Sequence, residues 1–313
     1  MPWLPNRAKT LTMRVLLGSL FAMSLLGSAY AEGDSLVDSL GPREIAVGEA
    51  MRGGATGATA IGLNPAGLPL NHELVFEGGY GYRASDQANL VGISACDSTN
   101  VLPGCFYYDY AGSNPELAGM SVKRSTHVFG SSVAYPISQG FSLGTSAKYF
   151  DHSTNVMGEA DESGFTFDAG MNYRVANTIS FGVAGYNLVG TTSAEFPRAA
   201  GGGVYARPAQ LLALSFDARW KLLDGDHSAR YGGGAEFFFR NDDGQVGIPL
   251  RAGILHDSGL GKTYLSGGLG LAGMKYSLDV GGRFAVDGGR ERMIIASLRF
   301  YGPRIGAGQS AAE

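Results

Sequence analysis

Two cysteines are the residues of this 313-residue chain whose spacing most directly suggests covalent chemistry. Cys96 and Cys105 lie in one stretch, with Pro103 and Gly104 between them. In an oxidising compartment such a pair forms a disulfide that closes a short loop and stabilises the fold by a few kcal/mol at most. A metal-binding pair or a redox couple is the alternative. Because the N-terminus is typical of an exported protein, we expect the disulfide.

Charged side chains recur at alternate positions along much of the chain, and we expect them to point into one interior. The functional interpretation is a polar pore lining or a ladder that orients a ligand. The simpler interpretation is a network of ion pairs that fills a narrow interior and is stabilised by mutual hydrogen bonds. Either one disfavours a wide hydrophobic conduit. The predicted lumen-lining residues are Lys148, Asp168, Arg174, Asp217, Arg219, Glu236, Arg240, Arg251, Lys275, Asp279, Arg283 and Arg299.

Other apparent motifs do not predict catalysis. Residues 259–263 resemble the end of a phosphate-binding loop, but His256 stands where that motif needs its first glycine. The pair His72-Glu73 lacks the second histidine of a zinc-protease helix. The acidic groups at 224–226 and 241–244 are more typical of turns than of a calcium loop. We therefore expect no enzymatic activity, no cofactor and no metal.

The elements that would position the charged residues are β-strands. In the stretch 274–286 the even positions are Met, Tyr, Leu, Val, Gly, Phe and Val, whereas the odd ones are Lys, Ser, Asp, Gly, Arg and Ala. Such alternation, repeated in copies of about 10 residues, is typical of a transmembrane β-barrel with apolar side chains toward lipid and polar ones toward the lumen. The pattern predicts strands at 74–83, 127–136, 141–150, 165–174, 179–188, 200–206, 211–220, 231–240, 248–255, 263–271, 274–286 and 292–300.

The strand number depends on the interruption at 84–124. Without it the count is about 12, and with an extra hairpin near 90–95 and 106–110 it is 14. The connections between strands alternate between short and long, as periplasmic turns and external loops do in outer-membrane barrels. We therefore expect an all-β, antiparallel, up-and-down barrel of 12–14 strands over residues 73–301, with both ends of the barrel on the periplasmic side.

The N-terminus has the features of a cleaved export signal. Arg7, Lys9 and Arg14 are followed by an apolar run at 15–26 and by Ala-Tyr-Ala at 29–31, which predicts a signal peptide over 1–31. No later run of about 18 apolar residues exists, so the mature chain would span a membrane only as a closed barrel. The net charge of −4 does not suggest a nucleic-acid partner. Glycine is abundant, with 49 residues, which suits a tightly curved sheet.

Residues 32–72 are rich in glycine and alanine and lack the alternation. We expect a hatch that packs in the lumen, or a short helix and loop at the periplasmic mouth. Asn64, Pro65, Ala66 and Gly67 are turn-forming residues. They could anchor a hatch or gate, or they could launch the first strand, and the two roles are compatible. Residues 302–313 are expected to form a periplasmic tail.

Several of these segments resemble a known family. The segment 43–50 (Arg-Glu-Ile-Ala-Val-Gly-Glu-Ala), the element 64–68 (Asn-Pro-Ala-Gly-Leu), Tyr-Asn-Leu at 186–188 and Ile-Pro-Leu-Arg-Ala-Gly at 248–253 are similar to the FadL and PorV-like group of outer-membrane transport proteins. The resemblance implies a 14-stranded barrel with an N-terminal hatch. Some members of the group pass hydrophobic compounds, and others are partners in secretion or surface assembly.

Two functions are therefore expected in the outer membrane of a Gram-negative bacterium. The first is passive transport of small or hydrophobic molecules. The alternative is a non-transporting barrel that serves as a scaffold or anchor of an envelope complex for secretion, motility or surface assembly. The expected partners are membrane lipid and lipopolysaccharide, and then hydrophobic small molecules or other envelope proteins.

Overall fold

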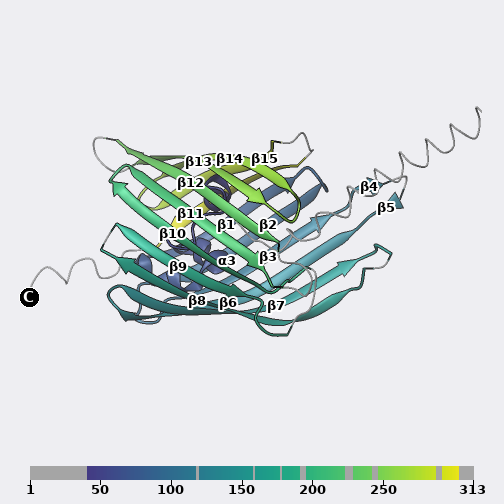
Figure 1. Ribbon diagram of the computed structural model, residues 1–313, viewed down its shortest axis with the longest axis horizontal. Helices are drawn as coiled ribbons and strands as arrows, with labels where there is room; N and C mark the ends of the chain where they lie inside the picture. Colours follow the sequence, from purple (N-terminus) through teal and green to yellow (C-terminus); the bar gives the residue numbers. More distant parts are fainter. Residues whose placement is uncertain are drawn as a thin grey trace, which may run out of the picture.

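The sheet closes on itself, because its first and last strands pair. The computed structural model describes residues 41–117, 120–157, 159–176, 178–190, 195–222, 228–241, 246–286 and 291–302. In this part of the chain fourteen antiparallel strands form one closed barrel (Figure 1). The ladder between β1 and β16 is continuous from Val75 opposite Tyr301 to Arg83 opposite Met293. Closure removes the free strand edges, as a sheet in hydrocarbon requires. The predicted fold class is confirmed.

The strands follow chain order around the barrel, apart from a small separate hairpin formed by β4 and β5. β6, β7 and β8 are the longest, with 15, 14 and 14 residues. The bounds are β1 (Leu74–Arg83), β2 (Ala88–Asp97), β3 (Gly104–Ser113), β4 (Glu116–Leu117), β5 (Met120–Ser121), β6 (Arg124–Ser138), β7 (Phe141–Thr154), β8 (Glu162–Val175), β9 (Ile179–Tyr186), β10 (Ala199–Ala209), β11 (Leu212–Lys221), β12 (Ala229–Arg240), β13 (Gly247–Asp257), β14 (Lys262–Ala272), β15 (Tyr276–Ala285) and β16 (Arg292–Tyr301).

The side chains alternate between the two faces as the sequence predicts. In β8, Phe165, Phe167 and Met171 are exposed on the outer face, whereas Thr166 and Asp168 between them are buried. The same arrangement recurs around the barrel, so large apolar side chains cover the outside and polar ones face the lumen. No helix among the described residues is long and apolar enough to cross a membrane.

The strand count of 14 comes from the stretch 84–124. Alternation alone predicts 12 strands, and the structure adds β2 and β3, so the hairpin considered near 90–95 and 106–110 is confirmed. The inner face of β2 carries Ala88, Leu90 and Gly92 in place of charged residues. Because both faces of this strand are largely apolar, its alternation is weak in the sequence.

The two ends of the barrel differ in their connections. At the turn end, where β1 begins and β16 finishes, the chain connects β2 to β3, β6 to β7, β8 to β9, β10 to β11, β12 to β13 and β14 to β15. At the loop end it connects β1 to β2, β3 to β6, β7 to β8, β9 to β10, β11 to β12, β13 to β14 and β15 to β16. The loop 258–261 precedes β14, so the glycine-lysine motif at 259–263 is a hairpin connection.

Residues 41–72, called the hatch segment from here on, precede the barrel and pack against its strands. They form α2 (Pro42–Ala46), α3 (Ala58–Leu63) and the 3-10 helix η2 (Pro65–Leu70). Figure 1 shows these purple elements inside the ring of strands. The predicted signal peptide at 1–31, the start of the predicted hatch at 32–40 and residues 303–313 of the predicted tail lie outside the described residues.

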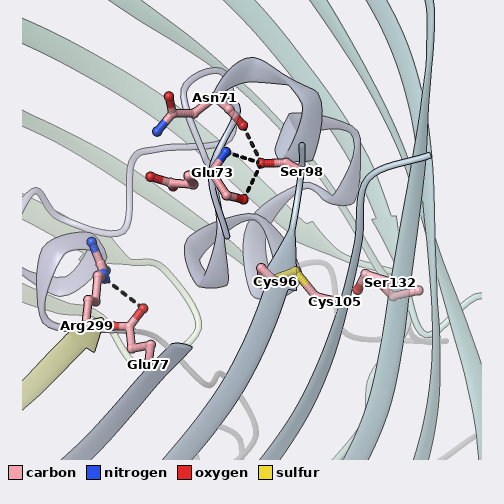
Figure 2. Close-up of a disulfide and its surroundings, with 9 residues drawn as sticks. Asn71, Glu73, Glu77, Cys96, Ser98, Cys105, Ser132 and Arg299 are labelled. Carbon is pink, nitrogen blue, oxygen red and sulfur yellow. Dashed lines mark hydrogen bonds and ion pairs between the residues drawn. A yellow bond between two sulfur atoms is a disulfide. The ribbon is translucent and has the colours of Figure 1, made fainter. Parts of the chain in front are cut away.

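The predicted disulfide joins neighbouring strands at the turn end. Cys96 of β2 lies opposite Cys105 of β3, with 4.1 Å between their Cα atoms. Figure 2 shows this bridge beside the start of the barrel. There the Ser98 hydroxyl accepts a hydrogen bond from the Glu73 backbone N–H at 3.0 Å, and the Ser98 N–H donates to the Glu73 carbonyl at 2.9 Å. These contacts fasten the connection between the hatch segment and β1 to the end of β2.

Candidate functional site

The hatch segment follows the inner wall of the barrel along a path of glycines. α2 contacts β13–β16, and η2 contacts β6–β9. A Cβ atom added at Gly281 would lie 2.1 Å from the Pro42 carbonyl oxygen, and one at Gly232 would lie 1.9 Å from the Gly48 carbonyl oxygen. Since no side chain fits there, these glycines let the hatch segment approach the wall. The same holds at Gly144, Gly170, Gly182, Gly234, Gly253 and Gly268.

Asn64 holds the middle of the hatch segment in place. Its side-chain amide donates to the carbonyl of Arg52 and to that of Met171 in β8, both at 3.0 Å, and its Oδ1 accepts from the Ala66 N–H at 3.2 Å. Pro65 and Ala66 lie against Gly144 of β7. Asn64 is fully buried. The turn-forming residues predicted at this point therefore join two turns of the hatch segment to the wall.

Arg52 ties the hatch segment to β9 and β11. Its Nη1 and its backbone N–H lie 3.0 and 2.8 Å from Asp217 Oδ2, and its Nε donates to the Tyr186 hydroxyl at 2.7 Å. Both members of the ion pair are almost fully buried. In such a place neither charge could be removed alone without leaving the other unpaired. The Tyr186 hydroxyl in turn donates to the Leu63 carbonyl, and the Arg219 guanidinium lies over the Tyr186 ring.

A chain of alternating charges continues toward the turn end. Arg43 of α2 contacts Glu236 through two nitrogens at 3.0 and 3.1 Å. Arg251 joins Glu236 to Asp279, with both contacts at 2.6 Å. Arg299 lies 3.9 Å from Asp279. Because each charge has an opposite charge beside it, this part of the lumen is lined by an ion-pair network.

Two further ion pairs complete the pattern. Arg299 also binds Glu77 of β1 at 2.8 Å, as the dashed line in Figure 2 shows. Glu49 of the hatch segment binds Arg283 and lies 3.7 Å from Arg230. The hatch segment therefore supplies partners of both signs to the wall.

The remaining predicted lumen residues divide into two groups. Lys148 lies 2.8 Å from Asp168 and donates to the Asn187 side chain at 2.9 Å, and Arg174 donates to the Leu70 carbonyl of the hatch segment at 3.0 Å. Lys275 was expected on the inner face but lies exposed in the turn 273–275, because β15 begins only at Tyr276.

Arg240 lies on the inner side of β12 but is exposed at the turn end, with its guanidinium over the Phe238 ring. A hollow of about 240 Å³ opens beside Arg240. Arginines predominate among its charged residues, which are Arg43, Arg207, Arg240, Arg251, Arg299, Glu236 and Asp279.

The hatch segment leaves a separate cavity of about 100 Å³ against the wall. We call it the wall cavity; α2 and α3 line one side, and β16, β1, β2 and β3 line the other. Its floor is the row in which Ser297, Gly79, Gly92 and Asp109 lie next to one another on successive strands. Two glycines in the middle of this row leave the hollow.

The neighbouring rows make the wall cavity largely apolar. On the loop-end side Ile295, Gly81 and Leu90 lie side by side. On the turn-end side Ser94 of β2 lies between Glu77 and Tyr107. The ladders between these strands are uninterrupted. The wall behind the cavity is therefore closed but thin, since backbone alone forms it at the glycines.

The loop end carries an aromatic cover. Phe196, from the loop 187–198, is fully buried and stacks on Phe150 of β7 with 3.9 Å between the ring centroids. The neighbouring Glu195 is largely buried, and burial raises the pKa of its carboxyl to about 7. Residues 195 and 196 therefore fold into the mouth of the barrel.

Sequence reasoning missed the partners that the hatch segment provides. Arg43, Glu49 and Arg52 lie in a stretch without strand periodicity, so alternation says nothing about where they point. The wall cavity was missed for a related reason, since the inner face of β2 has no charged residue and that of β3 has only Asp109. Gly79 of β1 and Gly92 of β2 were the available signal. Among the described residues no group of three or more His, Cys, Asp or Glu side chains could hold a metal ion.

These features define a class of protein: a closed barrel with an apolar outer face whose lumen holds an N-terminal hatch. No family model matches the chain, and no curated protein matches its sequence. Solved structures do match. The CymD monoaromatic hydrocarbon channel aligns with a TM-score of 0.64 at 15% identity, covering 86% of this chain and 98% of that one.

Two further structures agree. The Ralstonia pickettii toluene transporter TbuX aligns with a TM-score of 0.66 at 14% identity, covering 85% of this chain and 98% of that one. A Pseudomonas aeruginosa FadL homologue aligns with a TM-score of 0.61 at 12% identity, covering 84% and 97%. The chain therefore has the fold of FadL-type outer-membrane channels over most of its length, as the resemblance in its sequence implies.

Proposed function

We propose that this chain is an outer-membrane channel for the passive transport of small, largely hydrophobic molecules. The observation that carries the proposal is the wall cavity, a mostly apolar hollow between the hatch segment and β16, β1, β2 and β3. A concave apolar site with a few polar groups is the usual form of a small-molecule site. Proteins with this fold include channels named for toluene and monoaromatic hydrocarbons, which supports the same class of solute.

The division of the lumen supports a path beside β1–β3. Ion pairs and glycine contacts bind the hatch segment to β7–β15, whereas its contact with β2 is slight. An apolar solute would have to break several charged contacts of the hatch segment on the first side, whereas on the second side it would mainly displace apolar side chains. We therefore assign the charged lumen residues to positioning the hatch, and Asn64, Pro65, Ala66 and Gly67 to anchoring it.

Uptake by reconstituted protein tests the proposal. The full chain is placed in liposomes, and entry of a labelled monocyclic hydrocarbon is followed against entry of a sugar of similar mass. The proposal predicts uptake of the hydrocarbon faster than in protein-free liposomes and little gain for the sugar. Equal rates in the two kinds of liposome, with a folded barrel confirmed by its heat-modifiable migration on a gel, would contradict it.

The second candidate, a non-transporting scaffold, is favoured by one observation. The hatch segment is fastened by buried ion pairs from Arg52 to Asp217 and from Glu49 to Arg283, which would hold the lumen shut. Cross-linking in intact cells followed by isolation of the barrel tests this role. Recovery of a stoichiometric envelope partner, together with no hydrocarbon uptake, would favour the scaffold over the channel.

A further inference from the structure

The wall cavity contains polar atoms that have no hydrogen-bond partner among the described residues. They are Glu44 Oε2 of α2, Ser94 Oγ of β2 and Ser297 Oγ of β16. All three residues line the cavity, and their side chains are at least nine-tenths buried. A buried polar atom without a partner destabilises a protein, so natural structures rarely retain one without a bound water or ligand.

The arrangement places these atoms around an apolar hollow. Glu44 approaches from the hatch segment, whereas Ser94 and Ser297 belong to adjacent rows of the wall. Between them lie Gly79 and Gly92, which have no side chains to fill the space. Leu90, Ile295 and Tyr107 supply apolar surface nearby. The cavity therefore offers a carboxyl oxygen from the hatch segment and two hydroxyls that lie on either side of β1, with apolar surface between them.

The charge of Glu44 is moderated by its surroundings. Burial raises the pKa of its carboxyl above the ordinary value, although the nearby Arg299 acts in the opposite direction. Whether ionised or protonated, the carboxyl can accept a hydrogen bond. Arg299 itself is already bound to Glu77 at 2.8 Å. A guest with a full negative charge would therefore meet Glu44 and Glu77 first.

We infer that the wall cavity binds small neutral molecules that combine an apolar ring or chain with a hydroxyl group, such as simple phenols, and that Glu44 together with Ser94 or Ser297 recognises the hydroxyl. The inference rests on the proposed function, because it names the class of solute that the channel would accept. The cavity of about 100 Å³ is smaller than the apolar cavity of about 150 Å³ that can hold benzene, so it limits the guest to no more than one ring. The hydroxyl would satisfy Glu44 Oε2 and one of the two serine hydroxyls.

Binding of two matched probes to the purified full chain tests the inference. 4-Fluorophenol and 4-fluorotoluene differ only in a hydroxyl or a methyl group, and fluorine NMR reports the affinity of each. In the double variant S94A/S297A the ratio of phenol affinity to toluene affinity is expected to fall about 2- to 12-fold, the change that corresponds to the loss of a buried hydrogen bond. Glu44→Gln, which keeps the shape of the side chain, should also change the ratio.

Ser132→Ala is the matched control. Ser132 is a buried, lumen-facing serine outside the cavity, and its hydroxyl is 2.6 Å from that of Ser146. Its removal should leave the ratio unchanged. An affinity ratio that is the same in the wild type, the double variant and Glu44→Gln would overturn the inference, and so would water as the sole guest, seen as binding of neither probe. The proposed function fails separately, when the hydrocarbon also does not enter liposomes.

Discussion

Arg52 of the hatch segment and Asp217 of β11, which lie 165 positions apart, form a buried ion pair at 3.0 Å. The same carboxylate oxygen accepts the Arg52 backbone N–H at 2.8 Å. The wall thus holds the hatch segment by its main chain and by its side chain at one point. Both charged groups are buried, and each neutralises the other. We therefore expect this ion pair to control whether the hatch segment stays docked against the barrel wall.

Arg52→Met should loosen the hatch segment without unfolding the barrel. Removing one member of a buried pair leaves an uncompensated charge and costs about 3–5 kcal/mol. We expect faster amide hydrogen exchange in residues 41–72 and a higher ion conductance in planar bilayers. Arg240→Met, which removes an exposed arginine at the turn end, is the control. Unchanged exchange and conductance in Arg52→Met would show that the pair does not hold the hatch.

Gly182→Ala should displace the hatch segment by steric contact. A Cβ atom there would lie 2.0 Å from the Arg52 carbonyl oxygen, which is backbone and cannot rotate away. Overpacking of this kind costs about 1–3 kcal/mol, and thermal unfolding in detergent should show it. Gly202→Ala on the adjacent strand has its nearest contact at 3.5 Å, so its melting temperature should match the wild type. Equal melting temperatures for the two variants would contradict the glycine path.

Loss of the disulfide should lower stability but leave the barrel closed. Cys96 and Cys105 close a loop with a sequence separation of 9, for which the chain-entropy model gives about 2–3 kcal/mol. The double variant C96S/C105S should unfold at a lower temperature and still migrate as a folded barrel on a gel. The wild type treated with reductant should behave in the same way. A variant that fails to close would mean that the bridge is needed for assembly.

The loop that carries Glu195 should open as the pH rises. Burial raises the pKa of Glu195 from 4.5 to about 7, so the folded loop binds a proton more tightly than the unfolded loop does. The stabilisation is complete below about pH 4.5 and is lost between pH 4.5 and 7, with a total of up to about 3 kcal/mol. The hydrogen-exchange protection factors of the amides at 195, 196 and 198, which are corrected for the base-catalysed intrinsic rate, should therefore fall over this range. In Glu195→Gln they should not, and a variant that keeps the fall would exclude Glu195 as its cause.

The sequence predicts the barrel well because each strand has one face toward lipid and the other toward the lumen. The strand β1 at Leu74–Arg83 agrees with its predicted bounds, and the alternation in β8 predicts which side chains face outward. The prediction is weakest where the interior is not charged. β2 and β3 face the wall cavity instead of the ion-pair network, so the inner and outer faces of these strands differ little in polarity. Lys275 was wrongly predicted on the inner face, because the alternation in the sequence continues through 273–275 although these residues form a turn.

The candidate site was only partly accessible to sequence reasoning. Alternation identifies wall charges such as Asp217 and Arg283, but their partners Arg52 and Glu49 lie in a segment whose path depends on contacts with wall glycines. No local pattern shows that Gly182 makes room for Arg52, since the two come together only when the barrel closes. The disulfide was predictable because export chemistry and short spacing suffice for it.

Filling the wall cavity is the most direct test of transport along β1. Gly79 faces the cavity, and a Cβ added there would have its nearest contact at 3.4 Å, whereas its neighbour Gly78 faces outward with nothing within 4 Å. Hydrocarbon uptake into liposomes by Gly79→Leu, compared with Gly78→Leu, should fall about tenfold, corresponding to about 1.4 kcal/mol in the barrier. Uptake by Gly79→Leu at the rate of Gly78→Leu and the wild type would contradict a path through the cavity.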